Sequence, residues 1–304
     1  MAECRWTGAT NGKFLTENGN WSGNAPVTGD TVVVPADATQ DIDDELNASA
    51  VDLEGFTVEE GCTITIGTTS ADLQISLKNV TYFDANLGGT GRTFLDVDDY
   101  DQINITAAAA SPGAGQYGLT LVGTHDADDT SNRGTINVYA DTNQSIGIGA
   151  ELGTDMEVNK LVVVGGDVTV GSSVTEYDDA AAPDIEIYGG DVTTKCPVGT
   201  VTKNAGNWTH ESGAATAYYG QAGTTYYNSS GTLTNGYGSG NDLFTMEDNI
   251  DGATISNYQL KRGGGFRDPY KKATLTNGID LDRCKIEDVT LDLGNHITVT
   301  PSAV

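Results

Sequence analysis

The chain consists mainly of short runs in which apolar and polar residues alternate. An alternation with a period of two places successive side chains on opposite faces of a β-strand. These runs are Thr31–Val34, Phe56–Val58, Thr63–Ile66, Leu73–Leu77, Phe94–Val97 and Ile103–Thr106. Gly, Asn and Asp separate them, and no apolar pattern with the helical period persists over a useful length. The sequence therefore predicts an all-β protein with almost no helix.

A repeated unit gives the strongest indication of architecture. The segment Leu161–Gly171 recurs as Ile185–Thr193, with weaker copies at Val201–Thr209 and Tyr218–Tyr226. Each unit has a strand, a glycine corner, a second strand and a polar turn. The corners are marked by Gly166, Gly190, Gly206 and Gly223, so the spacings are 24, 16 and 17 residues. Such a period is typical of solenoids, and we expect successive units to stack as coils whose strands pair in parallel.

The first 45 residues differ from the repeats and have the features of a cap. Trp6 and Trp21 provide large apolar rings, and Gly29–Asp30 turns the chain into the strand Thr31–Val34. A solenoid needs such a cap because its terminal coil would otherwise expose unpaired strand edges. We predict a cap with the first strand over 1–45, a repetitive body over 46–241 and further β-rich coils over 242–304.

The opening Trp, Gly-Asp and Val-Val-Val pattern, followed by repeated Val-x-Gly-Gly-Asp-Val-Thr units, resembles the right-handed parallel β-helix of phage virion proteins and bacterial surface proteins. The resemblance covers 6–34 and 158–235 well and the remainder only in style. It implies an all-β, single-stranded parallel β-helix with an N-terminal cap that contains tryptophan. It says less about function, because capsid decoration proteins, tailspikes, adhesins and polysaccharide lyases share this architecture.

The net charge narrows the classes of partner. Fifteen Lys and Arg residues stand against 43 Asp and Glu residues, which gives a net charge of −28. Nonspecific binding to nucleic acid or to an anionic membrane needs a cationic face, so we expect neither partner. The first residues have no basic segment followed by an apolar run, so we expect a chain without a signal peptide that is made in the cytoplasm of its host.

Basic residues are concentrated near the C-terminus, where seven of them fall between 261 and 285. One interpretation is a solvated edge whose Lys and Arg prevent sheet pairing between chains. The other is a docking face for an acidic partner or for the acidic body of a second copy. The candidate docking residues are Trp6 and Trp21 in the cap and Lys261, Arg262, Arg267, Lys271 and Lys272 in the basic window.

No motif identifies a catalytic residue, and we predict neither catalysis nor a cofactor. His125, His210 and His296 are isolated, and we expect structural or loop positions for them. The acidic run Asp96–Asp101 lacks the glycine of a calcium loop, although a loosely bound Ca²⁺ stays open. The four cysteines are far apart, so we expect free and mostly buried thiols.

Five tyrosines in the later repeats have two interpretations. Inside the coil they would be packing residues, whereas outside it they could stack on sugar rings or anchor a protein interface. These residues are Tyr218, Tyr219, Tyr226, Tyr227 and Tyr237.

Together these features favour a structural virion protein. The cap begins at once and strands continue almost to the C-terminus, so we expect no separate particle-binding or trimerising domain. The first hypothesis is a capsid decoration protein on the phage head, whose partners are the major capsid protein and further copies of itself, a trimer being one arrangement. A tail-fibre or spike protein that recognises host polysaccharide is the alternative, and a polysaccharide lyase or hydrolase is a second alternative.

Overall fold

The computed structural model describes most of the chain as β-structure. The described residues are 2–12, 17–42, 53–59, 62, 64, 73–77, 80–86, 93–97, 100–111, 113–123, 133–150, 156–175, 182–281 and 284–294. By its contacts the chain divides into two compact units, Met1–Pro183 and Asp184–Val304. The predicted boundaries lie after residues 45 and 241, and this division coincides with neither of them. The predicted boundaries therefore stay predictions.

The N-terminal unit begins with a small parallel sheet. It contains β1 (Glu3–Arg5), β2 (Thr31–Val34) and β3 (Gly55–Val58), and every strand pairs in parallel with the next. A three-residue 3-10 helix, Asn18–Asn20, lies between β1 and β2. Alternate residues of β2 and β3 are buried, as the period-two pattern predicts.

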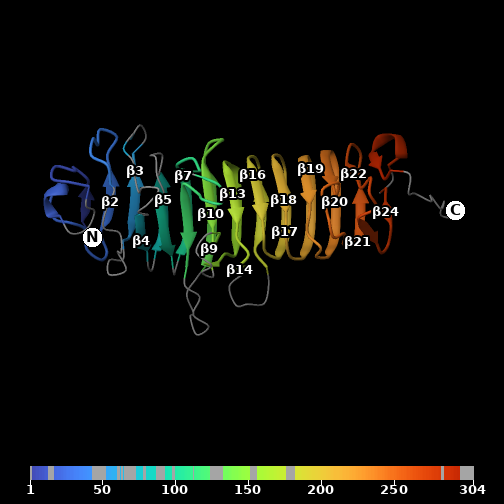
Figure 1. Ribbon diagram of the computed structural model, residues 1–304, viewed down its shortest axis with the longest axis horizontal. Helices are drawn as coiled ribbons and strands as arrows, with labels where there is room; N and C mark the ends of the chain where they lie inside the picture. Colours follow the sequence, from blue (N-terminus) through green and yellow to red (C-terminus); the bar gives the residue numbers. More distant parts are fainter. Residues whose placement is uncertain are drawn as a thin grey trace. The chain divides into compact units, whose positions relative to one another are not determined.

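The rest of the N-terminal unit is a series of parallel strands (Figure 1). These are β4 (Leu73–Leu77), β5 (Val80–Asn86), β6 (Thr93–Val97), β7 (Tyr100–Ala107), β8 (Leu119–Val122), β9 (Arg133–Tyr139), β10 (Ser145–Ile148), β11 (Met156–Glu157), β12 (Lys160–Gly165), β13 (Asp167–Val170) and β14 (Val174–Thr175). They pair in two series, β4–β6–β8–β10–β13 and β5–β7–β9–β12, with β11 and β14 as a separate pair. Strands adjacent in the chain therefore belong to different series.

Aliphatic side chains fill the interior of this unit in register. Ile103 pairs with Ile136, which pairs with Leu161, and all three are at most 1% exposed. The other series repeats the arrangement with Leu119, Ile146 and Val168. Because equivalent residues occupy equivalent positions, each strand buries its apolar face against the next.

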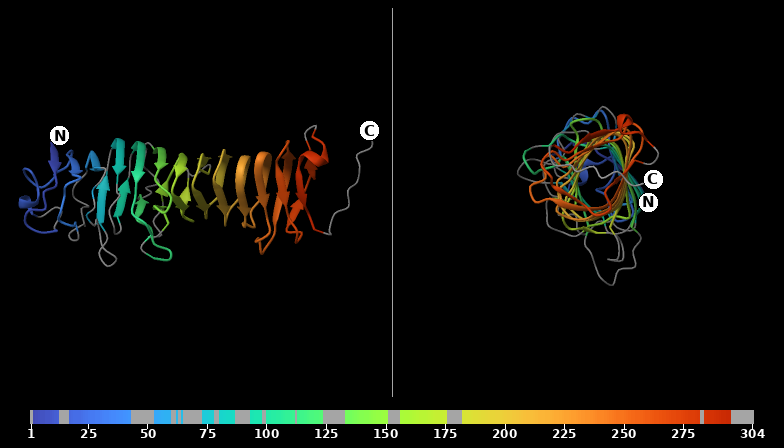
Figure 2. Two further views of the ribbon diagram at one scale, coloured as in Figure 1. Left: turned by 90° about the horizontal axis from the view of Figure 1, so that it is seen from above. Right: turned by 90° about the vertical axis from the view of Figure 1, so that its right-hand side faces the viewer.

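The C-terminal unit continues this pattern within itself, as the successive strands from β15 onward show in Figure 2. Its strands are β15 (Asp184–Ile187), β16 (Asp191–Thr194), β17 (Val198–Lys203), β18 (Asn207–His210), β19 (Ala215–Tyr227), β20 (Leu233–Thr245), β21 (Ala253–Leu260), β22 (Gly265–Arg267), β23 (Ala273–Leu275), β24 (Ile279–Asp280) and β25 (Thr290–Asp292). A 3-10 helix, Ile286–Asp288, precedes β25. One series runs β15–β17–β19–β20–β21 and the other β16–β18–β19–β20–β22–β25, all in parallel.

Glycines in the left-handed region form the corners between the two series. Gly190, Gly206 and Gly223 have φ angles of 75°, 76° and 83°, which disfavour any other residue. A Cβ at Gly206 would overlap the carbonyl oxygen of Gly190, and one at Gly223 would overlap that of Gly206. The three marker glycines of this unit therefore lie directly above one another. Gly166 has the same conformation but belongs to the N-terminal unit.

Aromatic rings fill the interior of the C-terminal unit. Trp208 stacks on Tyr218 with ring centroids 5.4 Å apart, and Phe244 stacks on Phe266 at 5.6 Å. Tyr258 packs edge-on against Phe266 at 4.9 Å. All five side chains are at most 2% exposed, so the rings form one continuous apolar column.

The prediction of an all-β chain with almost no helix is confirmed, and the large parallel sheet fits a β-solenoid in outline. The predicted strands at 31–34, 56–58, 73–77, 94–97 and 103–106 are present. Thr63–Ile66 falls largely outside the described residues.

Candidate docking surface

The two candidate tryptophans of the cap lie inside it. Trp6 and Trp21 are 1% and 5% exposed, and their rings meet edge-to-face with centroids 5.2 Å apart. Trp6 Nε1 donates a hydrogen bond to the carbonyl oxygen of Gln40 at 3.1 Å. Neither ring is presented to a partner, so their packing stabilises the cap. Docking by the surface around them stays a prediction.

The basic window is partly neutralised by the chain itself. Arg267 pairs with Glu247 at 2.9 Å and with Asp292 at 3.1 Å, so it ties β22 to neighbouring coils. Lys285 pairs with Glu287 at 3.3 Å, whereas Lys261 and Arg262 are exposed at a turn. Arg267 therefore has a structural role between coils, whereas the exposed Lys285–Glu287 pair contributes little to stability.

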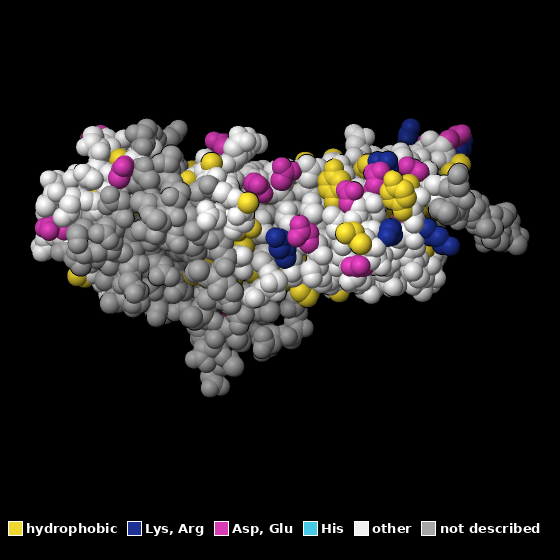
Figure 3. Space-filling model, in the orientation of Figure 1, with side chains coloured by type: hydrophobic (Ala, Val, Ile, Leu, Met, Phe, Trp, Pro, Cys, Tyr) yellow, Lys and Arg dark blue, Asp and Glu magenta, His cyan; other side chains and the backbone are white. Residues whose placement is uncertain are grey.

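Two other basic residues, Lys271 and Lys272, lie beside two exposed apolar side chains. Ile250 is 83% exposed and Tyr270 is 62% exposed. Tyr270 is close to Lys272 in the chain, and the backbone carbonyl of Ile250 accepts a hydrogen bond from Lys272 Nζ. We call Ile250, Tyr270, Lys271 and Lys272 the docking patch. On the face shown in Figure 3, Lys and Arg gather with hydrophobic side chains over the C-terminal strands, among Asp and Glu.

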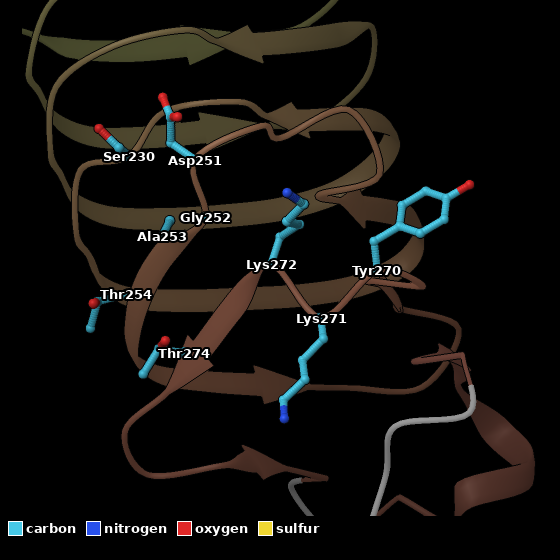
Figure 4. Close-up of a pocket in the computed structure, with 9 residues that line it drawn as sticks. All are labelled: Ser230, Asp251, Gly252, Ala253, Thr254, Tyr270, Lys271, Lys272 and Thr274. Atoms are coloured by element: carbon cyan, nitrogen blue, oxygen red, sulfur yellow. The ribbon is translucent and has the colours of Figure 1, made fainter.

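A shallow groove of about 480 Å³ adjoins the docking patch. It is lined by Ser230, Asp251, Gly252, Ala253, Thr254, Tyr270, Lys271, Lys272 and Thr274. Figure 4 shows the Tyr270 ring and the Lys272 amine on one side of this groove, with the Lys271 side chain pointing away from them. The groove thus offers hydroxyls, one aromatic ring, the Lys272 ammonium group and the Asp251 carboxylate to a partner.

Hydrogen bonds between side chains and the backbone hold the docking patch in this conformation. The buried Asp268 carboxylate accepts from the backbone N–H groups of Lys272 and Ala273, each at 2.7 Å. Lys271 has a φ of 57°, and Lys272 Nζ donates to the carbonyl oxygen of Ile250 at 2.6 Å. The tight turn between Asp268 and Lys272 therefore projects Tyr270 outward without a covering strand.

The tyrosines divide between the two interpretations that the sequence left open. Tyr218 and Tyr227 are fully buried, whereas Tyr219 and Tyr226 are 42% and 36% exposed. The rings of Tyr219 and Tyr237 stack with centroids 4.7 Å apart and an interplanar angle of 2°. Alternation along β19 and β20 explains the division, because neighbouring residues of a strand face opposite sides.

A second groove, of about 210 Å³, lies next to this tyrosine stack. Its lining residues are Asn235, Gly236, Tyr237, Asn257, Tyr258, Gln259, Asn277, Gly278 and Asp280. Their side chains are ordered by hydrogen bonds: Asn277 Nδ2 donates to Asn257 Oδ1 at 2.7 Å, and Gln259 Nε2 donates to Asp280 Oδ2 at 3.0 Å. The groove thus combines amide and carboxylate groups with the apolar surface of tyrosine rings.

The histidines, cysteines and acidic run that the sequence singled out are either structural or lie outside the described residues. His210 is buried: its Nδ1 accepts from the Thr194 hydroxyl at 2.8 Å and its Nε2 donates to the Gly213 carbonyl at 3.0 Å. Burial lowers its pKa to about 4, so the ring is neutral at physiological pH. His125 and His296 lie outside the described residues, and so does part of the Asp96–Asp101 run. Cys4, Cys62 and Cys196 are buried free thiols and Cys284 is half-buried, as predicted.

Sequence reasoning missed Ile250, Tyr270 and a buried pair, Lys203 and Asp242. The first two stand in irregular turns, where no periodicity indicates exposure. Lys203 did carry a signal, because it follows Val201 by two residues and so occupies an inward position of its strand.

Within the described part of the chain, no group of three or more His, Cys, Asp or Glu side chains is placed to hold a metal ion. No helix among the same residues is long and apolar enough to cross a bilayer. Comparison with protein-family models, with curated proteins and with solved structures gives no match.

Proposed function

We propose that this chain is a structural virion protein that decorates the outside of a phage capsid and acts without catalysis. The docking patch carries this proposal. An aromatic ring, an exposed aliphatic side chain and two lysines gather in a chain whose net charge is −28. Tyrosine is enriched at the energetic centres of protein interfaces, and the charges of neighbouring lysines favour a partner of opposite charge. An acidic capsid surface is the partner that fits them.

We further propose that the parallel strands close into a single-stranded β-helix. Two observations support this. Strands adjacent in the chain belong to different series, and the corner glycines 190, 206 and 223 stack within the C-terminal unit. The paired positions 191, 207, 224, 243 and 265 advance by 16, 17, 19 and 22 residues, which is one turn of chain per step.

Decoration by such a protein would be mechanical. Each docking patch is small, but a symmetric shell presents the same acceptor many times, and a self-associated decoration protein engages several acceptors at once. Shallow contacts then add up and oppose expansion of the filled head. The acidic remainder of the chain keeps free copies apart in solution.

The test is binding of the purified chain to particles of the virus that encodes it. We expect saturation at on the order of hundreds of copies per particle, because a closed shell repeats its acceptor by symmetry. Lys271→Glu combined with Lys272→Glu should abolish binding, and Tyr270→Ala should weaken it at least tenfold. Lys195→Glu is the matched control, since Lys195 is an exposed lysine of the same unit outside the docking patch. Binding that the double variant leaves unchanged would contradict the proposal.

Recognition of a neutral polysaccharide is the second candidate function, and the tyrosine groove favours it. Tyr237 offers an aromatic wall, while Asn257, Gln259 and Asp280 offer planar amides and a carboxylate to sugar hydroxyls. The local acidity disfavours acidic glycans. Binding of host-cell polysaccharide that Tyr237→Ala abolishes and Tyr270→Ala leaves intact would support this function over decoration.

A further inference from the structure

A lysine and an aspartate meet inside the C-terminal unit, remote from the docking patch. Lys203 ends β17 and Asp242 lies in β20. Lys203 Nζ is 2.7 Å from Asp242 Oδ1, and both side chains are 0% exposed. Buried ion pairs are costly, because both charges lose their hydration. Such a pair at the centre of an apolar column therefore needs an explanation.

Glycines make room for this pair. Lys203 stands opposite Gly220, and Gly220 stands opposite Gly238, so two successive inward positions lack a side chain. A Cβ at Gly220 would overlap both Asp242 Oδ2 and the Tyr218 hydroxyl. The Asp242 carboxyl and the hydroxyl of Tyr218 occupy the space that Gly220 leaves, and the Asp242 carboxyl in turn contacts the Lys203 amine.

Hydrogen bonds orient the two groups toward each other. Lys203 Nζ also donates to the carbonyl oxygen of Ala222 at 2.7 Å. Tyr218 Oη donates to Asp242 Oδ1 at 2.7 Å and is 2.6 Å from the Thr225 hydroxyl. Asp242 Oδ2, by contrast, is buried without a hydrogen-bond partner, and so is the hydroxyl of Tyr258. The contacts to Lys203 and Tyr218 thus polarise the carboxyl group through Oδ1, whereas no hydrogen bond holds Oδ2 in place.

Burial also favours the uncharged forms of both groups. It lowers the pKa of Lys203 and raises the pKa of Asp242. A neutral amine is a nucleophile, and a protonated carboxyl has a hydroxyl that can leave as water. The surrounding rings, which include Trp208, Phe244 and Tyr258, exclude the bulk water that would stabilise the separate ions.

We propose that Lys203 and Asp242 condense into an intramolecular isopeptide bond. The Nζ lone pair attacks Asp242 Cγ, and Oδ1 takes up the negative charge of the tetrahedral intermediate while Tyr218 Oη donates to it. A proton passes from Nζ to Oδ2, and the C–Oδ2 bond breaks to release one water molecule. The product is a secondary amide between Nζ and Cγ whose remaining N–H donates to the Ala222 carbonyl. The reaction needs no oxidant, reductant or co-reactant.

The bond would join β17 to β20 across the intervening β19. Because it forms only between groups that folding brings together, it locks three successive coils after they have stacked. This inference is independent of the proposed function: any role under mechanical load would benefit from the bond, but the bond does not require decoration.

Intact-mass spectrometry of the folded full chain tests the proposal directly. The chain should be about 18 Da lighter than its sequence, the mass of one water. After proteolysis, Lys203 and Asp242 should be found in one branched peptide, without tryptic cleavage after Lys203. A folded wild-type chain that keeps its full sequence mass after prolonged incubation overturns the proposal, and this result depends on no variant.

Variants then test which residues form the bond. Lys203→Met and Asp242→Ala should both have full mass, and Tyr218→Phe should slow the mass loss at least tenfold. Lys195→Met is the matched control, because Lys195 and Glu211 form an exposed pair at 3.6 Å that should not condense, so this variant should still lose about 18 Da. Loss of water in either Lys203→Met or Asp242→Ala would overturn the assignment.

Discussion

The interiors of the two units are filled in different ways although their strands pair alike. In the N-terminal unit, Ile103, Ile136 and Leu161 stand in register and form an aliphatic column. In the C-terminal unit the equivalent columns contain Trp208 and Phe244, and they also contain Lys203 and Asp242. The same parallel pairing therefore tolerates either kind of filling.

The difference shows what each filling requires. Aliphatic residues of similar size stack without special provision, because every strand repeats its neighbour. Large rings and polar groups need compensation, and the C-terminal unit supplies it through glycines opposite the bulky residues, such as Gly220 and Gly236, and through partners for polar atoms. The polar part of the C-terminal interior also holds the Lys203 amine and the Asp242 carboxyl together out of water.

The largest effect should come from removing a ring of the aromatic column. Trp208 stacks on Tyr218, lies near Tyr227, and its Nε1 donates to the Thr194 hydroxyl at 3.0 Å. Trp208→Ala should lower the free energy of unfolding by about 3–5 kcal/mol, because it leaves a cavity and removes the hydrogen bond that the Thr194 hydroxyl accepts. Ile136→Val in the N-terminal unit is the comparison and should cost about 0.5–1.5 kcal/mol. If urea denaturation showed that both variants lose the same free energy of unfolding, the distinction between the two interiors would be wrong.

The corner glycines provide the next test. Gly206→Ala should cost about 1–2 kcal/mol for the left-handed backbone and a further 1–3 kcal/mol for the overlap with the Gly190 carbonyl. Gly278 has a φ of 73° but nothing within 4 Å of the added Cβ, so Gly278→Ala should incur the backbone cost alone. Thermal melting of the two variants separates stacking from conformation, and identical melting temperatures would argue against stacked corners. Gly166→Val and Gly190→Val should disrupt folding, because both glycines have the left-handed backbone, with φ angles of 88° and 75°.

The buried histidine makes the stability of the C-terminal unit depend on pH. The pKa of His210 is about 4 in the folded chain, against an ordinary value of 6.5, so the unfolded chain binds more protons between these values. The stabilising contribution is complete above pH 6.5 and is lost as the pH falls to about 4. At 1.36 kcal/mol per pH unit this is roughly 3 kcal/mol. Urea denaturation at several pH values measures it, and His210→Phe should flatten the profile. A wild-type profile equally flat over this range would contradict the prediction.

The sequence indicated much of the fold because the fold is repetitive. Alternation located β2, β3 and β4, and the Gly-Gly-Asp pattern located the corners at 190 and 206. Gly263 is another stacked corner, because a Cβ there would overlap the carbonyl oxygen of Gly240. The spacing between corner glycines is longer there than between Gly190, Gly206 and Gly223, so the repeat pattern does not predict this corner.

The candidate site was less accessible to such reasoning. Charge counting located Lys271 and Lys272, but it could not show that Arg267 is bound by Glu247 and Asp292. The pairing of Lys203 with Asp242 joins positions whose strands belong to different coils, and only the register of β17, β19 and β20 brings them together. Local pattern specifies which face a residue occupies, whereas its partner depends on the number of residues in each coil.

Distances between spin labels test coil stacking most directly. Glu186, Thr202, Tyr219, Tyr237, Gln259 and Asp280 occupy successive paired positions of the C-terminal unit. With strands about 4.8 Å apart, labels at 237, 259 and 280 should lie roughly 14, 19 and 24 Å from a label at 186, so that distance increases linearly with coil number. A series that fails to increase with coil number, or that decreases at any step, would contradict the account.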